Sequence, residues 1–249
     1  MQIKSLVKSS NPVLSDSVFQ QQASAAGALD RSETMTRSGA INKSLILFML
    51  LLGSAAMGWI YANPIILFGG MIAGLITVLV AVFKPQTSPI AAPLYSLFKG
   101  LSVGAISAMF ATAYGGIVFH AVTLTLTILF VMLVIYKSGI IKVTSKFRAG
   151  VIMATFSVVI IYAISFVLSL FGVSVPMIHE GGWLAIGFSL LVIGIASLNL
   201  LLDFDNFDKG EEQGAPKYME WFVSLGLMIT LVWLYIEILR LLAILQGRD

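Results

Sequence analysis

One apolar stretch of the sequence, TLVWLYIEILRLLAIL, contains both an acidic and a basic residue. Glu237 and Arg240 are three residues apart, so in a helix their side chains lie on the same face. An ionisable side chain inside a membrane span costs at least a few kcal/mol, so each one needs an explanation. Two interpretations are open: a local ion pair near an interface, or a buried carboxylate that gains and loses a proton during function.

A second group of ionisable residues is expected on the opposite side of the membrane. Lys99 lies about one and a half turns into an apolar segment, and Asp203 and Asp205 follow another. Lys99 either extends its long stem to the interface or pairs with a carboxylate. The two acids are either solvated or need a cation, because acids at a helix C-terminus oppose the macrodipole. Their matching depth predicts a pair between Lys99 and one of these acids.

His120 lies near the outer end of an apolar segment, at a depth similar to that of Glu237. Its side chain either bonds to neighbouring backbone or titrates near neutral pH together with Glu237. These positions give a hypothesis of two polar levels. The inner level contains Lys99 with Asp203 or Asp205, and the outer level contains His120, Glu237 and Arg240.

The composition shows what kind of fold must hold these residues. Of the 249 residues, 58% are hydrophobic and 11% are charged, against roughly 25% charged in soluble domains. The mean hydropathy is +0.97, and no charged residue occurs between Lys43 and Lys84. A lipid bilayer is the solvent that suits such a chain. The stretch between Lys43 and Lys84 has room for two spans of about 20 residues each.

The sequence also excludes several classes of function. The chain has no Cys, which excludes disulfide-stapled domains, thiolate metal sites and cysteine catalysis. No glycine-rich phosphate loop and no HExxH motif is present, and no basic run is typical of nucleic-acid binding. We therefore expect neither an enzyme nor a cofactor, and no nucleic-acid partner.

The apolar residues form seven segments, which predict an all-α bundle of seven transmembrane helices. Residues 1–42 are predicted to be a polar, mobile tail, and residues 43–249 the membrane domain. The segments are too long and too little alternating for barrel strands. They cover about 45–62, 64–83, 93–112, 117–136, 151–171, 183–202 and 218–245, and the acidic loop DFDNFDKGEEQGAPK joins the last two.

Lysine and arginine predict the orientation of the bundle. They occur in the tail and in every even-numbered loop, while the first, third and fifth loops have none. Because basic loops stay on the cytoplasmic side, the N-terminus is expected inside and the C-terminus outside. The basic residues of the even loops are Lys84 in the second loop, Lys137, Lys142, Lys146 and Arg148 in the fourth, and Lys209 and Lys217 in the sixth.

An ordered set of motifs resembles the bacterial branch of the Bax inhibitor-like membrane proteins, from about Met35 to Leu245. The motifs are MTRSGAINKS, APLYSLFKGLSVGAIS, IIKVTSKFRAGV, LNLLLDFDNFDKG, GAPKYMEWF and WLYIEILRLL. The resemblance implies a seven-helix bundle with the last helix central. It also implies a proton-sensitive calcium leak across the inner membrane, gated by two embedded acids that match Asp203 and Glu237. Coupled carboxylates share protons, and their oxygens suit transient calcium binding.

Two features depart from that family pattern. Lys99 stands where bacterial relatives usually have an acid. A cation there should weaken the attraction of calcium to the inner mouth or hold Asp203 in an ion pair. A rise of 1.5 Å per residue also places Glu237 about 28 Å from Tyr218 along a helix, far from Asp203 unless the helix tilts or begins in the cytosol.

Two functions from different classes remain open. The first is a pH-sensitive leak channel whose partners are the bilayer, calcium ions and protons. The second is an interaction protein that modulates another membrane complex, such as a quality-control protease, for which the polar tail would matter. A membrane enzyme would need a stronger polar constellation than the scattered serines and one embedded histidine provide.

Overall fold

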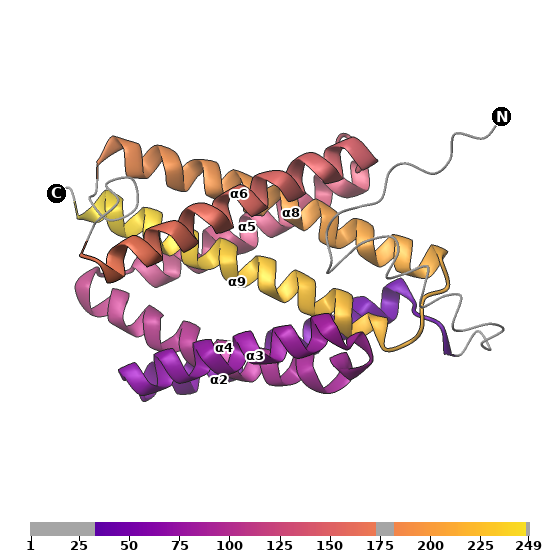
Figure 1. Cartoon of the computed structure of the whole chain (residues 1–249), viewed down its shortest axis with the longest axis horizontal. Helices are drawn as coiled ribbons and strands as arrows, with labels where there is room; N and C mark the ends of the chain where they lie inside the picture. The colour runs from indigo at the N-terminus through magenta and orange to yellow at the C-terminus, as the bar shows by residue number, and fades with distance from the viewer. Residues whose placement is uncertain (1–32, 173–181, 248–249) are drawn as a thin grey trace. The chain divides into compact units, whose positions relative to one another are not determined.

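The computed structural model describes residues 33–172 and 182–247, and its regular elements there are helices (Figure 1). Seven of them are long and apolar enough to cross a membrane, which confirms the predicted all-α fold of seven spans. They are α2 (Arg37–Ile60), α3 (Pro64–Phe83), α4 (Ser88–Ala113, after the 3-10 turn η2, Pro85–Thr87), α5 (Ile117–Ser138), α6 (Ser145–Leu170), α8 (Trp183–Glu212) and α9 (Met219–Gln246). The predicted tail lies outside the described residues as far as residue 32.

Helix capping explains why two spans begin earlier than their apolar segments do. Helix α2 begins at Arg37 because the side chain of Thr36 accepts a hydrogen bond from the backbone N–H of Gly39. Helix α6 begins at Ser145 because Thr144 accepts in the same way from Phe147. Hydropathy detects the apolar part of a span, whereas the cap determines where the helix begins.

The predicted acidic loop after residue 202 is wrong over its first ten residues, because α8 continues as a helix to Glu212. Asp205 and Lys209 form an ion pair of 2.9 Å one helical turn apart, and Arg37 pairs with Asp208 at 3.2 Å. The positive φ of Gly214 (62°) follows the helix end. Asp203 therefore lies within the helix rather than at its C-terminus, so the expected conflict with the macrodipole does not arise.

The helices form two compact units. The first unit contains α2, α3, α4 to Ile106, the end of α8 from Asp203, and α9 to Ile229. Glycine permits close helix contact inside it: a Cβ at Gly58 would overlap the backbone of Leu101, and one at Gly104 would overlap that of Ala55. In this unit α2, α3 and α4 lie side by side (Figure 1).

The second unit contains the end of α4 from Ser107, α5, α6, α8 to Leu202, and α9 from Thr230. Val158, Phe188 and Val192 form a buried cluster against which Tyr162 and Trp233 pack. The hydroxyls of Ser107 and Tyr235 share a hydrogen bond of 2.7 Å. This unit therefore combines apolar packing with polar contacts between its helices.

Helix α9 contributes to both units and is the most buried of the spans. In its apolar stretch 78% of the residues are buried, against at most 44% in the other six spans. This burial confirms the prediction that the last helix is central. Polar side chains on α9, such as those of Glu220 and Glu237, are therefore buried in protein.

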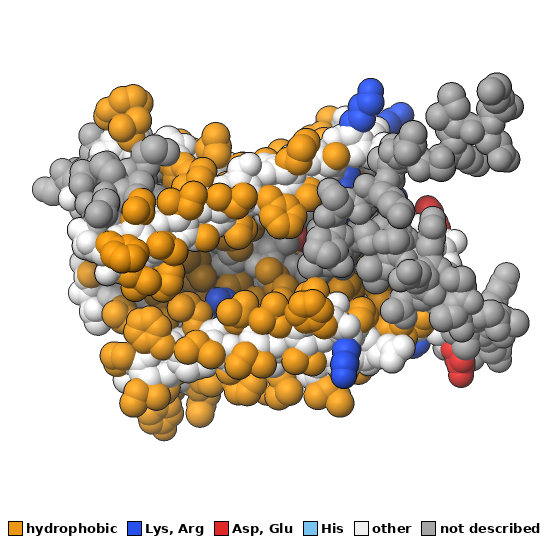
Figure 2. All heavy atoms as spheres, viewed as in Figure 1, with side chains coloured by type: hydrophobic (Ala, Val, Ile, Leu, Met, Phe, Trp, Pro, Cys, Tyr) orange, Lys and Arg blue, Asp and Glu red, His pale blue; other side chains and the backbone are white. Residues whose placement is uncertain are grey.

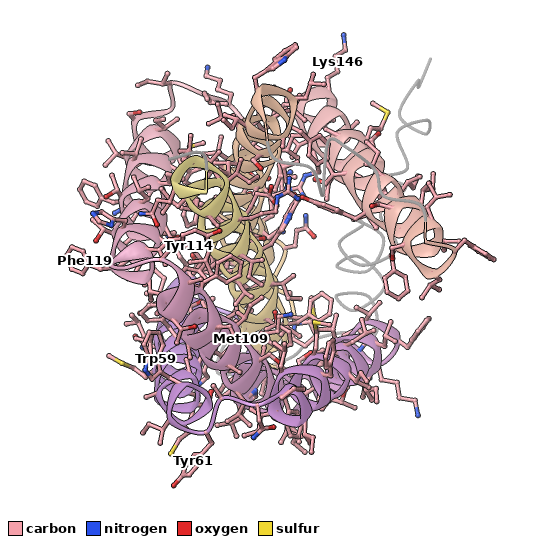
Figure 3. The ribbon with its side chains drawn as sticks, turned by 90° about the vertical axis from the view of Figure 1, so that its left-hand side faces the viewer. Trp59, Tyr61, Met109, Tyr114, Phe119 and Lys146 are labelled. Carbon is pink, nitrogen blue, oxygen red and sulfur yellow. The ribbon has the colours of Figure 1, made fainter. Side chains whose placement is uncertain are left out.

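The outer surfaces of the other helices suit a lipid environment. Hydrophobic side chains cover most of the helix surface in view in Figure 2. Trp59 and Tyr61 lie exposed at the C-terminal end of α2, and Lys146 extends outward from the start of α6 (Figure 3). Aromatic and basic side chains at span ends are typical of membrane interfaces.

Candidate functional site

The predicted pair of Glu237 and Arg240 is present, and it is buried. Glu237 is only 3% exposed, and its Oε1 atom lies 3.3 Å from Nη2 of Arg240. The one-turn spacing in α9 places both side chains on one face. The two residues thus form a local ion pair, and the carboxylate of Glu237 is buried.

Tyr162 and Ser189 complete this site, and sequence inspection missed both. The hydroxyl of Tyr162 donates to Oε2 of Glu237 at 2.7 Å and accepts from Nη1 of Arg240 at 2.6 Å. Nη2 of Arg240 also donates to Oγ of Ser189 at 3.0 Å. We call these four residues, from α6, α8 and α9, the Glu237 cluster. Tyr162 could have been suspected, because a phenol in the middle of an apolar span needs a hydrogen-bond partner.

Aromatic rings enclose the guanidinium of Arg240. Its Cζ atom lies 5.5 Å from the ring centroid of Tyr162 and 5.6 Å from that of Phe188. Cation–π attraction adds to the ion pair where water is largely absent. The cation is thus held by one carboxylate, two hydroxyl groups and two rings, while the phenol of Tyr162 joins it to Glu237 a second time.

The charge balance of the Glu237 cluster depends on the carboxylate of Glu237. If Glu237 becomes neutral, Arg240 remains positive in a largely buried position and loses its counter-charge. Removing one partner of a buried pair typically costs several kcal/mol, because the other charge is left uncompensated. The Glu237 carboxylate therefore stabilises the contacts that join α9 to the helices carrying Tyr162 and Ser189.

The prediction that His120 joins this level is wrong. Its side chain is exposed, and its Nδ1 atom lies 2.9 Å from the carbonyl oxygen of Gly116, one turn earlier in α5. The ring also meets Phe119 edge to face. The alternative sequence interpretation, a hydrogen bond to neighbouring backbone, is the one that the structure supports.

The predicted inner pair is also wrong. Among the residues that the structure describes, Lys99 makes no ion pair, and its stem lies against Gly74 of α3. Asp205 pairs with Lys209 instead, because the unexpected continuation of α8 brings that lysine one turn away. The depth argument failed because matching depth does not determine the direction in which a side chain points around its helix axis.

Asp203 is a buried acid in the first unit. It is 5% exposed, and a Cβ added to Gly226 of α9 would lie 3.5 Å from its Oδ1 atom. Glu237 belongs to the second unit. The carboxylate of Asp203 therefore lies next to α9 at Gly226.

The site has no ready-made cage for a cation. Within residues 33–172 and 182–247, no three His, Cys, Asp or Glu side chains are grouped as metal ligands. Calcium takes six to eight oxygen ligands, whereas the carboxylate of Glu237 is already bound by Arg240 and Tyr162.

Comparison with known families shows to which family the chain belongs. The family described as Bax inhibitor 1 like matches residues 11–247, which is nearly the whole chain and includes the Glu237 cluster. The chain belongs to the Bax inhibitor 1 like family. No curated protein matches it.

A third buried acid of this Bax inhibitor 1 like chain, Glu220, was not predicted from the sequence. It lies in the first turn of α9 and is 1% exposed. Its Oε1 atom accepts hydrogen bonds from N and Oγ1 of Thr36, at 3.0 and 3.1 Å, and lies 2.9 Å from Nζ of Lys217. Glu220 belongs to the motif GAPKYMEWF and Thr36 to MTRSGAINKS, so two motifs far apart in sequence meet here.

Tyr218 adjoins this contact at the turn before α9. Burial raises the pKa of its phenol, and the hydrogen bond with Gln86 lowers it by a smaller amount. The phenol is therefore neutral throughout the physiological pH range. It links the turn before α9 to the turn before α4.

Proposed function

We propose that this protein is a pH-sensitive, calcium-permeable leak of a bacterial inner membrane, with the Glu237 cluster as its proton-responsive element. The observation that carries the proposal is the nearly complete burial of Glu237 against Arg240 and Tyr162 in the most buried span. Membership of the Bax inhibitor 1 like family supports it, because the sequence motifs imply such a leak.

The gating step follows from charge balance within the cluster. While Glu237 is ionised, its carboxylate holds Arg240 and accepts from Tyr162, which joins α6, α8 and α9. A proton on Glu237 cancels this attraction and leaves a cation among apolar side chains. The helices then separate enough for water and cations to pass. Calcium is the substrate of this path, and Arg240 must move out of the path before a divalent cation can pass.

Asp203 has a separate role in the proposal, as an acid at the inner entrance. Its carboxylate is buried beside Gly226 on α9. A carboxylate there attracts cations that approach from the cytoplasmic side. Substitution of Asp203 by Asn should therefore lower calcium flux without removing its dependence on pH.

The proposal is tested by uptake of labelled calcium into proteoliposomes over a range of pH values. The native protein should conduct more as the pH falls. Glu237→Gln imitates the protonated state, so this variant should conduct at a high level that no longer depends on pH. Glu212→Gln, an exposed acid at the end of α8, is the matched control and should behave like the native protein. Equal flux of Glu237→Gln and the native protein at every pH contradicts the assignment.

The orientation is part of the same proposal. The basic residues of the even loops support a cytoplasmic N-terminus, cytoplasmic even loops and an external C-terminus. Labelling of single cysteines in intact cells tests this. A cysteine at Ile140, which is 76% exposed in the loop after α5, should be protected from an impermeant reagent, and one at Tyr61 should react.

Deletion of residues 1–32 separates the leak from the interaction protein that the sequence also allows. A leak keeps its calcium flux after this deletion, because Glu237, Arg240 and Tyr162 remain. An adaptor shows no flux before or after it, and loses its membrane partner when the tail is removed.

A further inference from the structure

The start of α2 is capped by a residue from a different helix. Thr36 is the N-cap, and its Oγ1 atom accepts from the backbone N–H of Gly39 at 3.0 Å. In a capping box, the third helical residue is a Glu or Gln whose side chain returns to the N–H of the N-cap. Here the third residue is Gly39, and Glu220 of α9 binds the N–H of Thr36 instead, at 3.0 Å.

Gly39 and Glu220 occupy the same space. A Cβ at Gly39 would overlap the carboxylate of Glu220. The position that would normally provide the capping acid therefore has no side chain, because the acid arrives from α9. The capping box of α2 is thus divided between two helices that are nearly two hundred residues apart in sequence.

Backbone contacts fasten the same two regions together. The N–H of Met35 donates to the carbonyl of Ala215 at 2.6 Å, and the N–H of Lys217 donates to that of Glu33 at 2.8 Å. These bonds surround an antiparallel bridge between Thr34 and Pro216. We call residues 33–36 the strap. It pairs with the turn that leads into α9.

Side chains continue the connection along both helices. Oγ of Ser224 in α9 donates to the carbonyl of Ala40 in α2 at 2.8 Å and lies 3.0 Å from Oγ of Ser44. Both serines are buried. The first turns of α2 and α9 therefore share their polar contacts, and neither can unwind without exposing donors or acceptors of the other.

We propose that the strap and the first turn of α9 form a latch, with Glu220 as the shared cap that makes the starts of α2 and α9 open and close together. Release of the strap frees the N-terminal end of the helix that carries Glu237 further along. The latch is a conformational device of the fold itself, and its existence does not depend on the proposed leak.

Hydrogen exchange on the full chain in lipid nanodiscs tests the latch. Glu220→Ala removes the shared cap, so amides of residues 33–40 and 214–218 should both exchange faster, by roughly fivefold, the change expected for the loss of one helix cap. Glu211→Ala, an exposed acid at the end of α8, is the control and should leave both segments unchanged.

The double variant Gly39→Glu with Glu220→Ala separates a latch from an ordinary cap. It restores a complete capping box within α2, so residues 36–40 should regain native protection. Residues 214–218 should remain fast, because no carboxylate then joins α9 to the strap. Glu220→Gln, which keeps an oxygen acceptor for Thr36 and loses the pair with Lys217, should give a smaller effect on both segments.

Three results would overturn the latch: Glu220→Ala that affects only one of the two segments, a double variant in which both segments recover together, or exchange that none of the variants changes. Calcium flux of the same preparations gives an independent reading. A native protein without flux contradicts the proposed function, whereas the exchange pattern still decides the latch.

Discussion

Helix α9 carries two buried carboxylates that form opposite kinds of site. Glu220 binds the backbone N–H and hydroxyl of Thr36 in another helix, and its ion-pair partner Lys217 is 51% exposed. Glu237 binds only side chains, and its partner Arg240 is 20% exposed. Both pairs have the same one-turn spacing in sequence, so spacing alone did not distinguish them.

The difference concerns what each carboxylate supports. Glu220 satisfies the start of a helix, so it fixes the course of the chain. Glu237 neutralises the cation of Arg240 inside an apolar span, so it stabilises a buried charge. Loss of Lys217 leaves Glu220 with two other hydrogen bonds, whereas loss of Arg240 leaves Glu237 with the phenol alone. We therefore expect loss of the cation to destabilise the Glu237 cluster more than the Glu220 contact. The Glu220 contact should depend mainly on its hydrogen bond to the backbone N–H of Thr36.

The largest difference should appear when each cation is replaced by an apolar residue of similar length. Arg240→Met should lower the free energy of unfolding by about 3 kcal/mol, since it leaves a buried charge. Lys217→Met should cost less than about 1 kcal/mol, because its ammonium is half exposed. Denaturant unfolding in detergent micelles measures both values, and equal losses would show that the two pairs are not different in kind.

A second comparison uses glycines of the same helix. Gly39→Ala should cost about 2 kcal/mol, because the new Cβ overlaps the Glu220 carboxylate. Gly53→Ala is the matched control in α2, where nothing lies within 4 Å of the added Cβ. Thermal unfolding gives both values. The cost at Gly39 should largely disappear in a Glu220→Ala background, and its persistence there would contradict the shared cap.

The phenol of the Glu237 cluster should matter more than another buried phenol on α9. Tyr162→Phe removes a donor to Glu237 and an acceptor from Arg240, so we expect a loss of about 1.5 kcal/mol. Tyr235→Phe removes only the bond with Ser107 and should cost about half as much. Chemical unfolding of the two variants measures this difference. A smaller loss for Tyr162→Phe would indicate that its hydroxyl is not part of the ion-pair network.

The smallest predicted effect is an alkaline dependence close to the latch. Burial raises the pKa of Tyr218, so the stabilisation from its neutral phenol is fully present below the unfolded value of about 10. It is lost as the pH rises through the higher pKa of the folded state. Tyr218→Phe should therefore flatten the decline of stability above about pH 10, and an unchanged curve would contradict the assigned shift.

Much of the fold was predictable, because hydropathy marks spans directly. The bounds expected for α3 were those found, and the last span differed by one residue at each end. The start of α2 was missed because it depends on Thr36, and the end of α8 because the Asp205–Lys209 pair sustains a helix through an acidic stretch. Local interactions of polar residues, rather than hydropathy, determine these ends.

The site was predictable only where its residues are neighbours in sequence. Glu237 and Arg240 were found together because they are one turn apart in an apolar segment. Tyr162 and Ser189 lie on other helices, and Thr36 is the N-cap of α2. A single sequence does not indicate which faces of these helices pack against α9. His120 and Lys99 were misplaced for the same reason, since matching depth does not determine direction around a helix axis.

The central claim is that Glu237, and not Glu220, is the carboxylate whose protonation accompanies opening of the leak. Infrared difference spectra of the protein in lipid, recorded as the pH is lowered, report the carbonyl stretch of newly protonated carboxyl groups. The account predicts a band that is present in the native protein and in Glu220→Gln, absent in Glu237→Gln, and half complete at the pH at which calcium flux is half maximal. A band that persists in Glu237→Gln would contradict the account.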